Sequence, residues 1–190
     1  IIKELYMGGC VKDDGTTAYS NDAYVILYNN SDMEADASDI QFTFAAPYNA
    51  NGTNKYITDG KLLYEDLDWM PAYGAIWWVT SPGKIPAYSQ VVVALFGAID
   101  HTATVKASVN LSNPSYYVMS NSGIQQYTNA KYAVSEAIPT SHYLTAKPFT
   151  QGNAWAISNQ CPAFYIGRAS QAEAVALSTN TDAFDRTLGT

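Results

Sequence analysis

The stretch DAYVILYNNSDMEAD, residues 22–36, decides the fold class. Residues 24–28 within it form a run of aliphatic and aromatic residues that favour β-strands. Successive side chains of a strand point to opposite faces, so this run predicts an interior strand with both faces buried. Residues 29–32 (NNSD) carry short polar side chains that bond their own backbone. We therefore expect the strand to end there in a turn.

Short apolar runs between turn residues recur along the chain and predict an all-β fold. The predicted strands are residues 1–7, 23–28, 40–45, 75–80, 90–96, 103–109, 142–146, 154–158 and 163–168. Many short strands favour an immunoglobulin-like β-sandwich over alternating βα units. Short helical insertions are predicted at the capping box from Ser170 to Glu173 and at Asn113-Pro114. One hairpin is expected among the loops of residues 47–69.

Length and charge restrict the classes of protein to consider. A chain of 190 residues suits one domain, 1–190, that buries a core without staples. A net charge of −7 and a pI near 4.6 argue against a nucleic-acid partner, which needs clustered basic residues. No apolar run approaches the roughly 20 residues of a membrane-spanning helix. The chain begins inside a predicted strand without an initiator Met, so we expect it to have been trimmed.

Catalytic residues are not indicated by any motif. His101 and His142 are isolated in the sequence, and no Gly-x-Ser-x-Gly elbow accompanies them. Glu65, Asp66 and Asp68 could serve a hydrolase, but three acids in four residues are typical of a solvated loop. We therefore predict a protein that is not an enzyme, with no catalytic residues and no cofactor.

Metal ligands and paired thiols are also not predicted. Asp13, Asp14 and Asp22 could offer oxygen atoms to calcium, but they lack an ordered ligand spacing and indicate a solvated acidic turn. Cys10 and Cys161 match no zinc or redox motif. Nothing in the sequence brings their Cα atoms within the roughly 7 Å that a disulfide needs. Two free, largely buried thiols are favoured over one long-range disulfide.

Aromatic residues near loops supply the strongest candidate for a binding site. Sugars bind flat aromatic faces flanked by hydrogen-bonding groups, and Trp69, Tyr73 and Tyr88 lie close in sequence to acids and to Gln90. These three aromatic residues are the predicted carbohydrate platform. The alternative is that the aromatic residues of the chain pack in the core of a sandwich.

The opening segments together resemble the lamin-tail type of immunoglobulin-like domain. The matching segments are residues 2–5 (IKEL), 27–32 (LYNNSD) and 35–38 (ADAS), followed by Pro86 ahead of the valine-rich residues 91–93. The resemblance implies that residues 1–110 form a lamin-tail-like core and that residues 111–190 elaborate it.

The whole chain resembles an uncharacterised family of surface lipoproteins from Bacteroides-type bacteria. Residues 27–32, 138–144 (IPTSHYL) and 151–155 (QGNAW) carry this resemblance. It implies an exported protein at the outer membrane or cell surface, held to the membrane only by a lipid anchor outside this chain. It assigns no activity and no functional residues.

These observations converge on a non-enzymatic surface module that serves attachment or assembly. Its expected partner is a glycan or a surface protein. A carbohydrate-binding module is the first alternative, and a hydrolase is the second.

Overall fold

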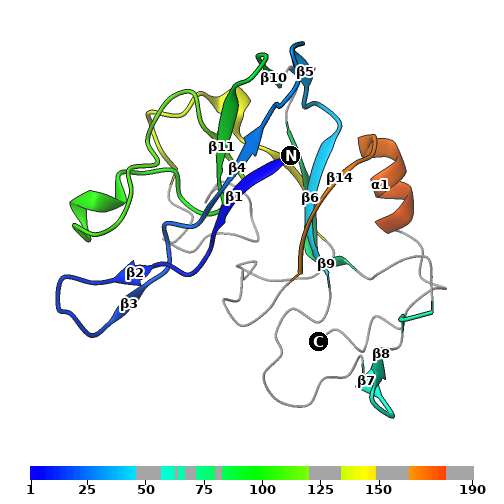
Figure 1. Cartoon of the computed structure of the whole chain (residues 1–190), viewed down its shortest axis with the longest axis horizontal. Helices are drawn as coiled ribbons and strands as arrows, with labels where there is room; N and C mark the ends of the chain where they lie inside the picture. Colours follow the sequence, from blue (N-terminus) through cyan, green and yellow to red (C-terminus); the bar gives the residue numbers. More distant parts are fainter. Residues whose placement is uncertain are drawn as a thin grey trace. The chain divides into compact units, whose positions relative to one another are not determined.

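The computed structural model describes residues 1–45, 57–62, 64–66, 72–79, 83–119, 134–148 and 163–178. Strands dominate these residues, and the helices among them are short, so the predicted all-β class is confirmed (Figure 1). The chain divides into two compact units. Unit 1 is built mainly from Ile1–Ser38 and Val79–Thr145, and unit 2 from Asp39–Trp78 and chain that follows Thr145. Both units use residues from either side of position 110, and the division proposed at that position stays a prediction.

Unit 1 contains a four-stranded sheet that confirms the interior strand predicted from the opening stretch. Its strands are β1 (Ile2–Tyr6), β4 (Tyr24–Tyr28), β11 (Gln90–Ala94) and β12 (Tyr117–Val118), in the order β1-β4-β11-β12. The β4 strand pairs antiparallel with both β1 and β11, whereas β12 runs parallel to β11. The predicted strands at residues 1–7, 23–28 and 90–96 are therefore present, within a few residues at their ends.

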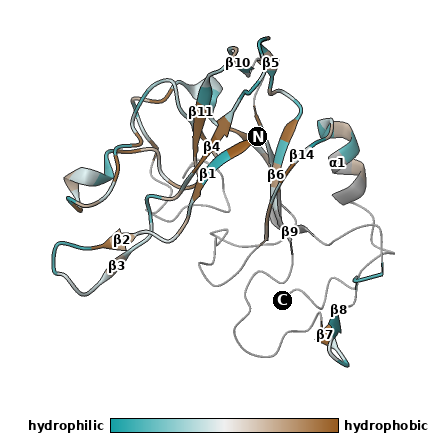
Figure 2. Cartoon of the chain, in the orientation of Figure 1, coloured by the Kyte–Doolittle hydropathy of each residue, from teal (hydrophilic) through white to brown (hydrophobic). Residues whose placement is uncertain are grey.

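Both faces of β4 are apolar, as expected. Val25 and Leu27 are only 0% and 5% exposed on one face. On the other face, Tyr24 and Ile26 pack against an apolar cluster formed by Val92, Ala94, Ala98, Leu111, Val118 and Ile138. Figure 2 shows the hydrophobic colour along β4 and β11. The sheet thus gains stability from burial on two sides.

Unit 2 contains a second four-stranded sheet. Its strands are β13 (Thr145–Pro148), β9 (Ala72–Trp78), β6 (Ile40–Ala45) and β14 (Ala163–Arg168), in the order β13-β9-β6-β14. Phe42, Trp77 and Trp78 of this sheet are all buried, so neither of the adjacent tryptophans is exposed. The predicted strands at residues 40–45, 75–80 and 163–168 are confirmed in type, and the second begins earlier than expected.

One short helix, α1 (Gln171–Ser178), follows β14 in unit 2. The hydroxyl of Ser170 accepts a hydrogen bond from the backbone N–H of Glu173, and the Glu173 carboxylate accepts from the backbone N–H of Ser170. This reciprocal pair is the capping box that the sequence predicts.

Three two-stranded ribbons complete the strands among the described residues: β2 (Cys10–Val11) with β3 (Ala18–Tyr19), β5 (Ala35–Asp36) with β10 (Lys84–Ile85), and β7 (Ile57–Thr58) with β8 (Lys61–Leu62). The third ribbon is the hairpin expected between residues 47 and 69. Asp59 and Gly60 form its turn with φ angles of 51° and 79°, the positive values that a two-residue hairpin turn of this kind requires.

The strand predicted at residues 103–109 is wrong. A 3₁₀ helix, η1 (His101–Ala103), and a series of turns occupy this region instead. The Asp100 carboxylate accepts hydrogen bonds from the backbone N–H and the hydroxyl of Thr102, which caps the helix. Short polar side chains therefore outcompete the strand pattern of the valines there.

The prediction at residues 142–146 is also wrong in part, because a 3₁₀ helix, η3 (Thr140–His142), precedes a strand that begins only at Thr145. Asn113-Pro114 begins a single hydrogen-bonded turn rather than a helix. In that turn the Asn113 side chain accepts a hydrogen bond from the backbone N–H of Ser115. The strand predicted at residues 154–158 lies outside the described residues.

Candidate functional site

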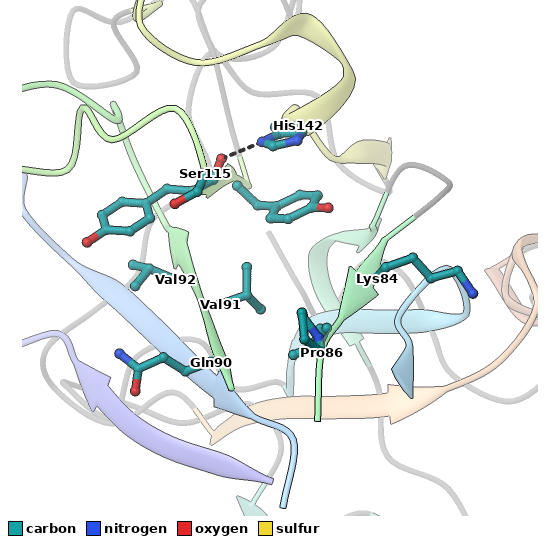
Figure 3. A pocket seen from close by; sticks show the side chains of 10 residues that line it. Lys84, Pro86, Gln90, Val91, Val92, Ser115 and His142 are labelled. Atoms are coloured by element: carbon teal, nitrogen blue, oxygen red, sulfur yellow. Dashed lines mark hydrogen bonds between the residues drawn. The ribbon is translucent and has the colours of Figure 1, made fainter. Parts of the chain in front are cut away.

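A pocket of about 340 Å³ lies in unit 1 beside the start of β11 (Figure 3). We name it the β11 pocket. Its lining residues are Lys84, Ile85, Pro86, Gln90, Val91, Val92, Ser115, Tyr116, Tyr117 and His142. Ligand pockets commonly have volumes of about 300–1,000 Å³, so this one has room for a small ligand.

Long-range strand pairing brings the walls of the pocket together. Val93 of β11 pairs with Tyr117 of β12, which places residues 115–117 beside the valines of β11. A bridge between Val118 and Tyr143 then places His142 beside the same segment. The pocket therefore depends on three chain segments that are far apart in sequence.

His142 is held by two contacts that leave part of its ring available. Its Nδ1 lies 3.0 Å from the carbonyl oxygen of Tyr116, and its ring stacks on that of Tyr117 with the centroids 4.4 Å apart. A carbonyl oxygen only accepts, so Nδ1 carries the proton and donates it. Among the described residues no partner is found for Nε2, which in the neutral ring accepts hydrogen bonds. Burial raises the pKa of the Tyr117 phenol, which keeps that group neutral.

In Figure 3, Gln90 and Val92 project to one side of β11 and Val91 to the other, and Ser115 and His142 lie farther along the pocket. The side-chain oxygen of Gln90 accepts a hydrogen bond of 2.6 Å from Lys3 Nζ. That bond leaves the two N–H groups of the Gln90 amide as donors. The Ser115 hydroxyl donates to the Asn113 side chain at 2.7 Å, so its oxygen keeps lone pairs that accept.

Lys84 is the only Lys, Arg, Asp or Glu among the lining residues, and its charge is compensated. Its ammonium lies 3.4 Å from a carboxylate oxygen of Glu34 and 3.7 Å from one of Asp36. Bonds from Ser38 and then the Lys84 charge hold the pKa of Asp36 below its usual value, so this carboxylate stays ionised. Apart from Lys84, the lining presents no Lys, Arg, Asp or Glu side chain.

Tyr88 belongs to a strained turn next to the pocket-lining residues Pro86 and Gln90. The backbone N–H of Ser89 donates to the carbonyl of Pro86, which closes the turn. Tyr88 occupies its third position with a φ of 51°, where glycine is the usual residue. The side chain is 63% exposed. Strained backbone with an exposed aromatic side chain is typical of functional loops.

A second group of polar side chains in unit 1 centres on the buried Asp22 and His101. We name it the closed cluster: Cys10, Tyr19, Asp22, His101 and Ser108. His101 is 1% exposed, and its Nε2 donates to the carbonyl of Gly97 at 2.9 Å. Its Nδ1 therefore accepts from the Tyr19 hydroxyl at 2.7 Å. Asp22 is 0% exposed and accepts from the Ser108 hydroxyl at 2.6 Å.

The surroundings of the closed cluster keep His101, Tyr19 and Cys10 in their neutral forms near neutral pH. Burial lowers the pKa of His101 and keeps its ring neutral. Burial and then the charge of Asp22 raise the pKa values of Tyr19 and of the Cys10 thiol, which lies 3.7 Å from an Asp22 oxygen. A thiol whose pKa is raised is a poor nucleophile at neutral pH. The cluster therefore offers no activated thiol or imidazole at neutral pH.

Only part of the predicted carbohydrate platform is described in side-chain detail. Tyr88 is exposed in unit 1, next to the pocket as described above. Tyr73 lies on β9 of unit 2, and Trp69 lies outside the described residues. A platform built from all three residues therefore stays a prediction.

Asp13, Asp14 and Asp22, which the sequence offered as possible calcium ligands, each bond to different partners. A side-chain oxygen of Asp13 accepts from the backbone N–H of Lys106 at 3.0 Å, whereas Asp14 caps its own turn. Bonds from the backbone of Thr17 strongly lower the pKa of Asp14. Asp22 belongs to the closed cluster. In the described part of the chain, no three His, Cys, Asp or Glu side chains gather in a metal-binding group.

The remaining predictions are tested only in part. Asp66 lies in an exposed turn, and Asp68 lies outside the described residues. Cys10 is a free thiol, as predicted, but it is half-buried rather than largely buried, and Cys161 lies outside the described residues. Within the described ranges no helix is long and apolar enough to cross a membrane.

Sequence reasoning noted Gln90 as a hydrogen-bonding residue near the predicted aromatic residues, but it missed His142, which also lines the pocket. An isolated histidine between Ser141 and Tyr143 carries no motif. Its role depends on the bridge between Val118 and Tyr143, which local sequence does not encode.

The described fold has a counterpart among solved structures. No protein-family model and no curated protein sequence matches the chain. The chain is similar in structure to a DUF4876 family protein from Bacteroides thetaiotaomicron VPI-5482, with a TM-score of 0.62 and 15% sequence identity over 90% of this chain. It spans 42% of the length of that protein. At this identity the similarity shows a shared fold alone.

Proposed function

We propose that this chain is a non-enzymatic module that serves attachment, and that the β11 pocket is the place where it binds its partner. The mixed lining of this pocket carries the proposal. It combines aromatic rings with free hydrogen-bonding groups, which is typical of small-ligand sites. Ser115 donates its hydroxyl proton to Asn113 and not to His142, so the described lining residues show no hydrogen-bonded pair of nucleophile and base.

A carbohydrate-binding module is the second candidate, because Tyr88 is exposed beside the pocket. An aromatic side chain held rigidly at a turn can support the flat face of a sugar ring. In this candidate Trp69, Tyr73 and Tyr88 remain the aromatic residues to test.

The proposed cellular setting is the surface of a Bacteroides-type bacterium. The fold shared with the Bacteroides protein supports a relationship to that family, and the predominance of strands supports the proposed immunoglobulin-like sandwich of the lamin-tail type. Export and a lipid anchor on the complete protein belong to the same proposal. Protease treatment of intact cells that express the complete gene tests it, because a surface protein is digested without lysis.

Attachment at the pocket can be tested with beads that carry the purified chain. Beads are washed over surfaces coated with mucin, plant polysaccharide, matrix protein or albumin. We expect retention on at least one coat, a loss of retention with Gln90→Ala, and no loss with Gln171→Ala, an exposed glutamine of unit 2. The same chain is incubated with nitrophenyl glycosides and esters. Turnover of any of these, or retention that ignores Gln90→Ala, contradicts the proposal.

A further inference from the structure

The lining of the β11 pocket comes from both faces of one strand. Successive side chains of a strand point to opposite faces, so Gln90 and Val92 lie on one face of β11 and Val91 lies on the other (Figure 3). Side chains from both faces can border the same cavity only along an edge of the strand. The β4 strand pairs with all of Gln90–Ala94 and closes one edge. The pocket therefore lies along the other edge, the one that faces β12.

Backbone groups of β11 point to this edge at every second residue. The N–H of Leu95, directly after β11, donates to the carbonyl of Ala23, directly before β4. Because bonded residues alternate in an antiparallel pair, the odd-numbered residues of β11 bond to β4 and the even-numbered residues direct their N–H and C=O groups to the opposite edge. There the carbonyl of Ala94 accepts from the N–H of Met119, directly after β12.

The half of this edge that borders the pocket is open. The β12 strand pairs only with Val93 and Ala94. In the described part of the chain, neither the carbonyl of Gln90 nor the N–H of Val92 has a backbone partner. A residue of a parallel strand donates to one residue of its neighbour and accepts from the residue two places later. The open edge therefore presents the acceptor and the donor that one further residue of parallel backbone needs.

The face of β11 that carries Val91 offers an apolar place for a side chain of such a segment. Tyr117 pairs with Val93 and therefore lies on the same face as Val91. The ring of His142 stacks on Tyr117, and Pro86 lines the same pocket (Figure 3). The volume of about 340 Å³ is at the small end for ligand pockets, and it suits one apolar side chain with its backbone.

Negative charge is in excess at the start of β11. The Lys84 ammonium lies 3.4 Å from a carboxylate oxygen of Glu34 and 3.7 Å from one of Asp36. Two carboxylates outnumber one ammonium, so this end of the pocket favours a cationic residue of a partner. Lys84 belongs to β10, which precedes β11 in the chain. In a segment parallel to β11, the cationic residue therefore comes before the apolar one.

We infer that the β11 pocket binds an extended peptide segment of a partner protein, which adds to the open edge of β11 and runs parallel to it. One apolar side chain of the segment lies beside Val91, and a Lys or Arg residue precedes it. Strand addition of this kind takes its affinity from main-chain bonds and its specificity from the places of alternate side chains. This inference rests on the proposed function and identifies the partner as a protein.

Nuclear magnetic resonance of the ¹⁵N-labelled chain first tests whether the edge is open. In the free chain, we expect the Val92 amide to exchange its hydrogen at least about tenfold faster than the amides of Val91 and Val93, which bond to β4. Slow exchange at Val92 would overturn the inference. Slow exchange that depends on protein concentration would assign the edge to a second copy, and slow exchange that does not would assign it to another segment of this chain.

A set of peptides then tests binding. The probes are acetyl-Lys-Thr-Z-Thr-Ser-Thr-amide, in which Z is valine, isoleucine, leucine, methionine, phenylalanine or tyrosine. We expect at least one of them to slow exchange of the Val92 amide and to leave the amides of Val91 and Val93 unchanged. Replacement of Z by aspartate should weaken binding of that peptide about tenfold, and replacement of its lysine by glutamate about threefold.

Methylation of single peptide nitrogens separates strand addition from other modes of binding. In the inferred arrangement the N–H of Z points to β11, whereas the N–H of the next residue points away from it. N-methylation of Z should therefore weaken binding at least about tenfold. N-methylation of the following threonine should leave binding unchanged.

Two variants of the chain, each with a matched control, test the side-chain positions. Val91→Thr should weaken peptide binding about fivefold, whereas Val11→Thr, the same change at a residue that is 53% exposed, should not. Glu34→Gln should weaken binding about threefold, whereas Glu65→Gln, an exposed position of unit 2, should not. If Val91→Thr fails to fold, the exposed Glu34 still tests the assignment.

The outcomes separate this inference from the proposed function. Bead retention that depends on Gln90, without binding of any of the peptides, overturns the peptide partner and leaves attachment at the pocket intact. Absence of both retention and peptide binding overturns both proposals. Equal weakening by the two N-methyl groups, or binding that leaves exchange of the Val92 amide unchanged, overturns strand addition at this edge. Binding that neither Val91→Thr nor Glu34→Gln weakens overturns the side-chain positions.

Discussion

His101 and His142 have the same side chain and the same kind of bond to a backbone carbonyl, yet they differ in what the second ring nitrogen does. In the closed cluster, Tyr19 occupies the second nitrogen of His101. At the β11 pocket, the second nitrogen of His142 has no partner among the described residues, and the ring lines a pocket. A histidine with both nitrogens used inside the protein stabilises the fold. One with a nitrogen left over at a pocket is suited to recognise a ligand.

The largest expected effect concerns the stability that each histidine provides. His101→Ala leaves a cavity and two buried groups without partners, so we expect the free energy of unfolding of unit 1 to fall by about 2–4 kcal/mol. His142→Ala removes a half-buried ring and should cost about 1–2 kcal/mol. Hydrogen exchange of the β4 and β11 amides measures both, because those strands belong to unit 1. Equal losses would show that the two rings do not differ in role.

The next effect is the pH dependence that His101 imposes on stability. Burial lowers its pKa in the folded state below the ordinary 6.5, so the unfolded chain takes up the proton first. Stability should therefore be complete above pH 6.5 and fall as the pH drops towards the folded pKa, by at most about 1.4 kcal/mol per pH unit. Hydrogen exchange between pH 8 and pH 5 measures the slope.

His101→Asn is the matched variant for that measurement. It should remove the histidine contribution to the slope, whereas His142→Asn should keep it. A slope that survives in His101→Asn would assign the effect to carboxylates instead.

A smaller effect is expected at the Cys10 thiol in the closed cluster. Asp22 contributes to the raised pKa of Cys10, after burial itself. Asp22→Asn removes the negative charge, so the thiolate fraction and the rate of alkylation by iodoacetamide should rise about threefold at pH 8. The measurement uses a Cys161→Ser background, with Asp13→Asn as the control for a more distant charge. An unchanged rate would mean that burial alone protects the thiol.

The smallest effect lies in the turn beside the pocket. Tyr88 has a φ of 51°, and asparagine tolerates that conformation better than tyrosine does. Tyr88→Asn should therefore raise stability by about 0.5–1 kcal/mol. If Tyr88 also supports the bound ligand, the same variant should reduce bead retention. A stability loss would show that the tyrosine ring packs favourably enough to offset the strain.

Local pattern was sufficient for the strands that lie in the two large sheets. Residues 24–28 and 90–94 are mostly apolar, and burial of these side chains on both faces of the sheet stabilises the strands. It was insufficient at residues 103–109, where Val105 and Val109 suggested a strand but the Asp100 cap begins a 3₁₀ helix. Hydrogen bonds between side chains and backbone two or three residues apart determine the structure of that region. The spacing of apolar residues in the sequence does not predict such bonds.

The candidate site was predictable only on the side that β11 provides. Tyr88 and Gln90 are close in sequence, so an aromatic residue beside a hydrogen-bonding group was visible there. The opposite side comes from Ser115 and His142, which reach β11 through the pairing of Val93 with Tyr117 and of Val118 with Tyr143. Pairings between distant segments depend on the whole fold, and a single sequence does not reveal them.

The parallel pairing of β12 with β11 also has a consequence for the order of folding. Parallel neighbours require a crossover rather than a tight turn, so the chain after β11 must travel away and return before β12 can dock. The segment around Tyr143 docks later still, because it pairs with β12. Closing such loops is entropically costly and slow. We therefore expect the walls of the β11 pocket to form last when unit 1 folds and to unfold first. A ligand that binds only the folded pocket would then reduce this local unfolding.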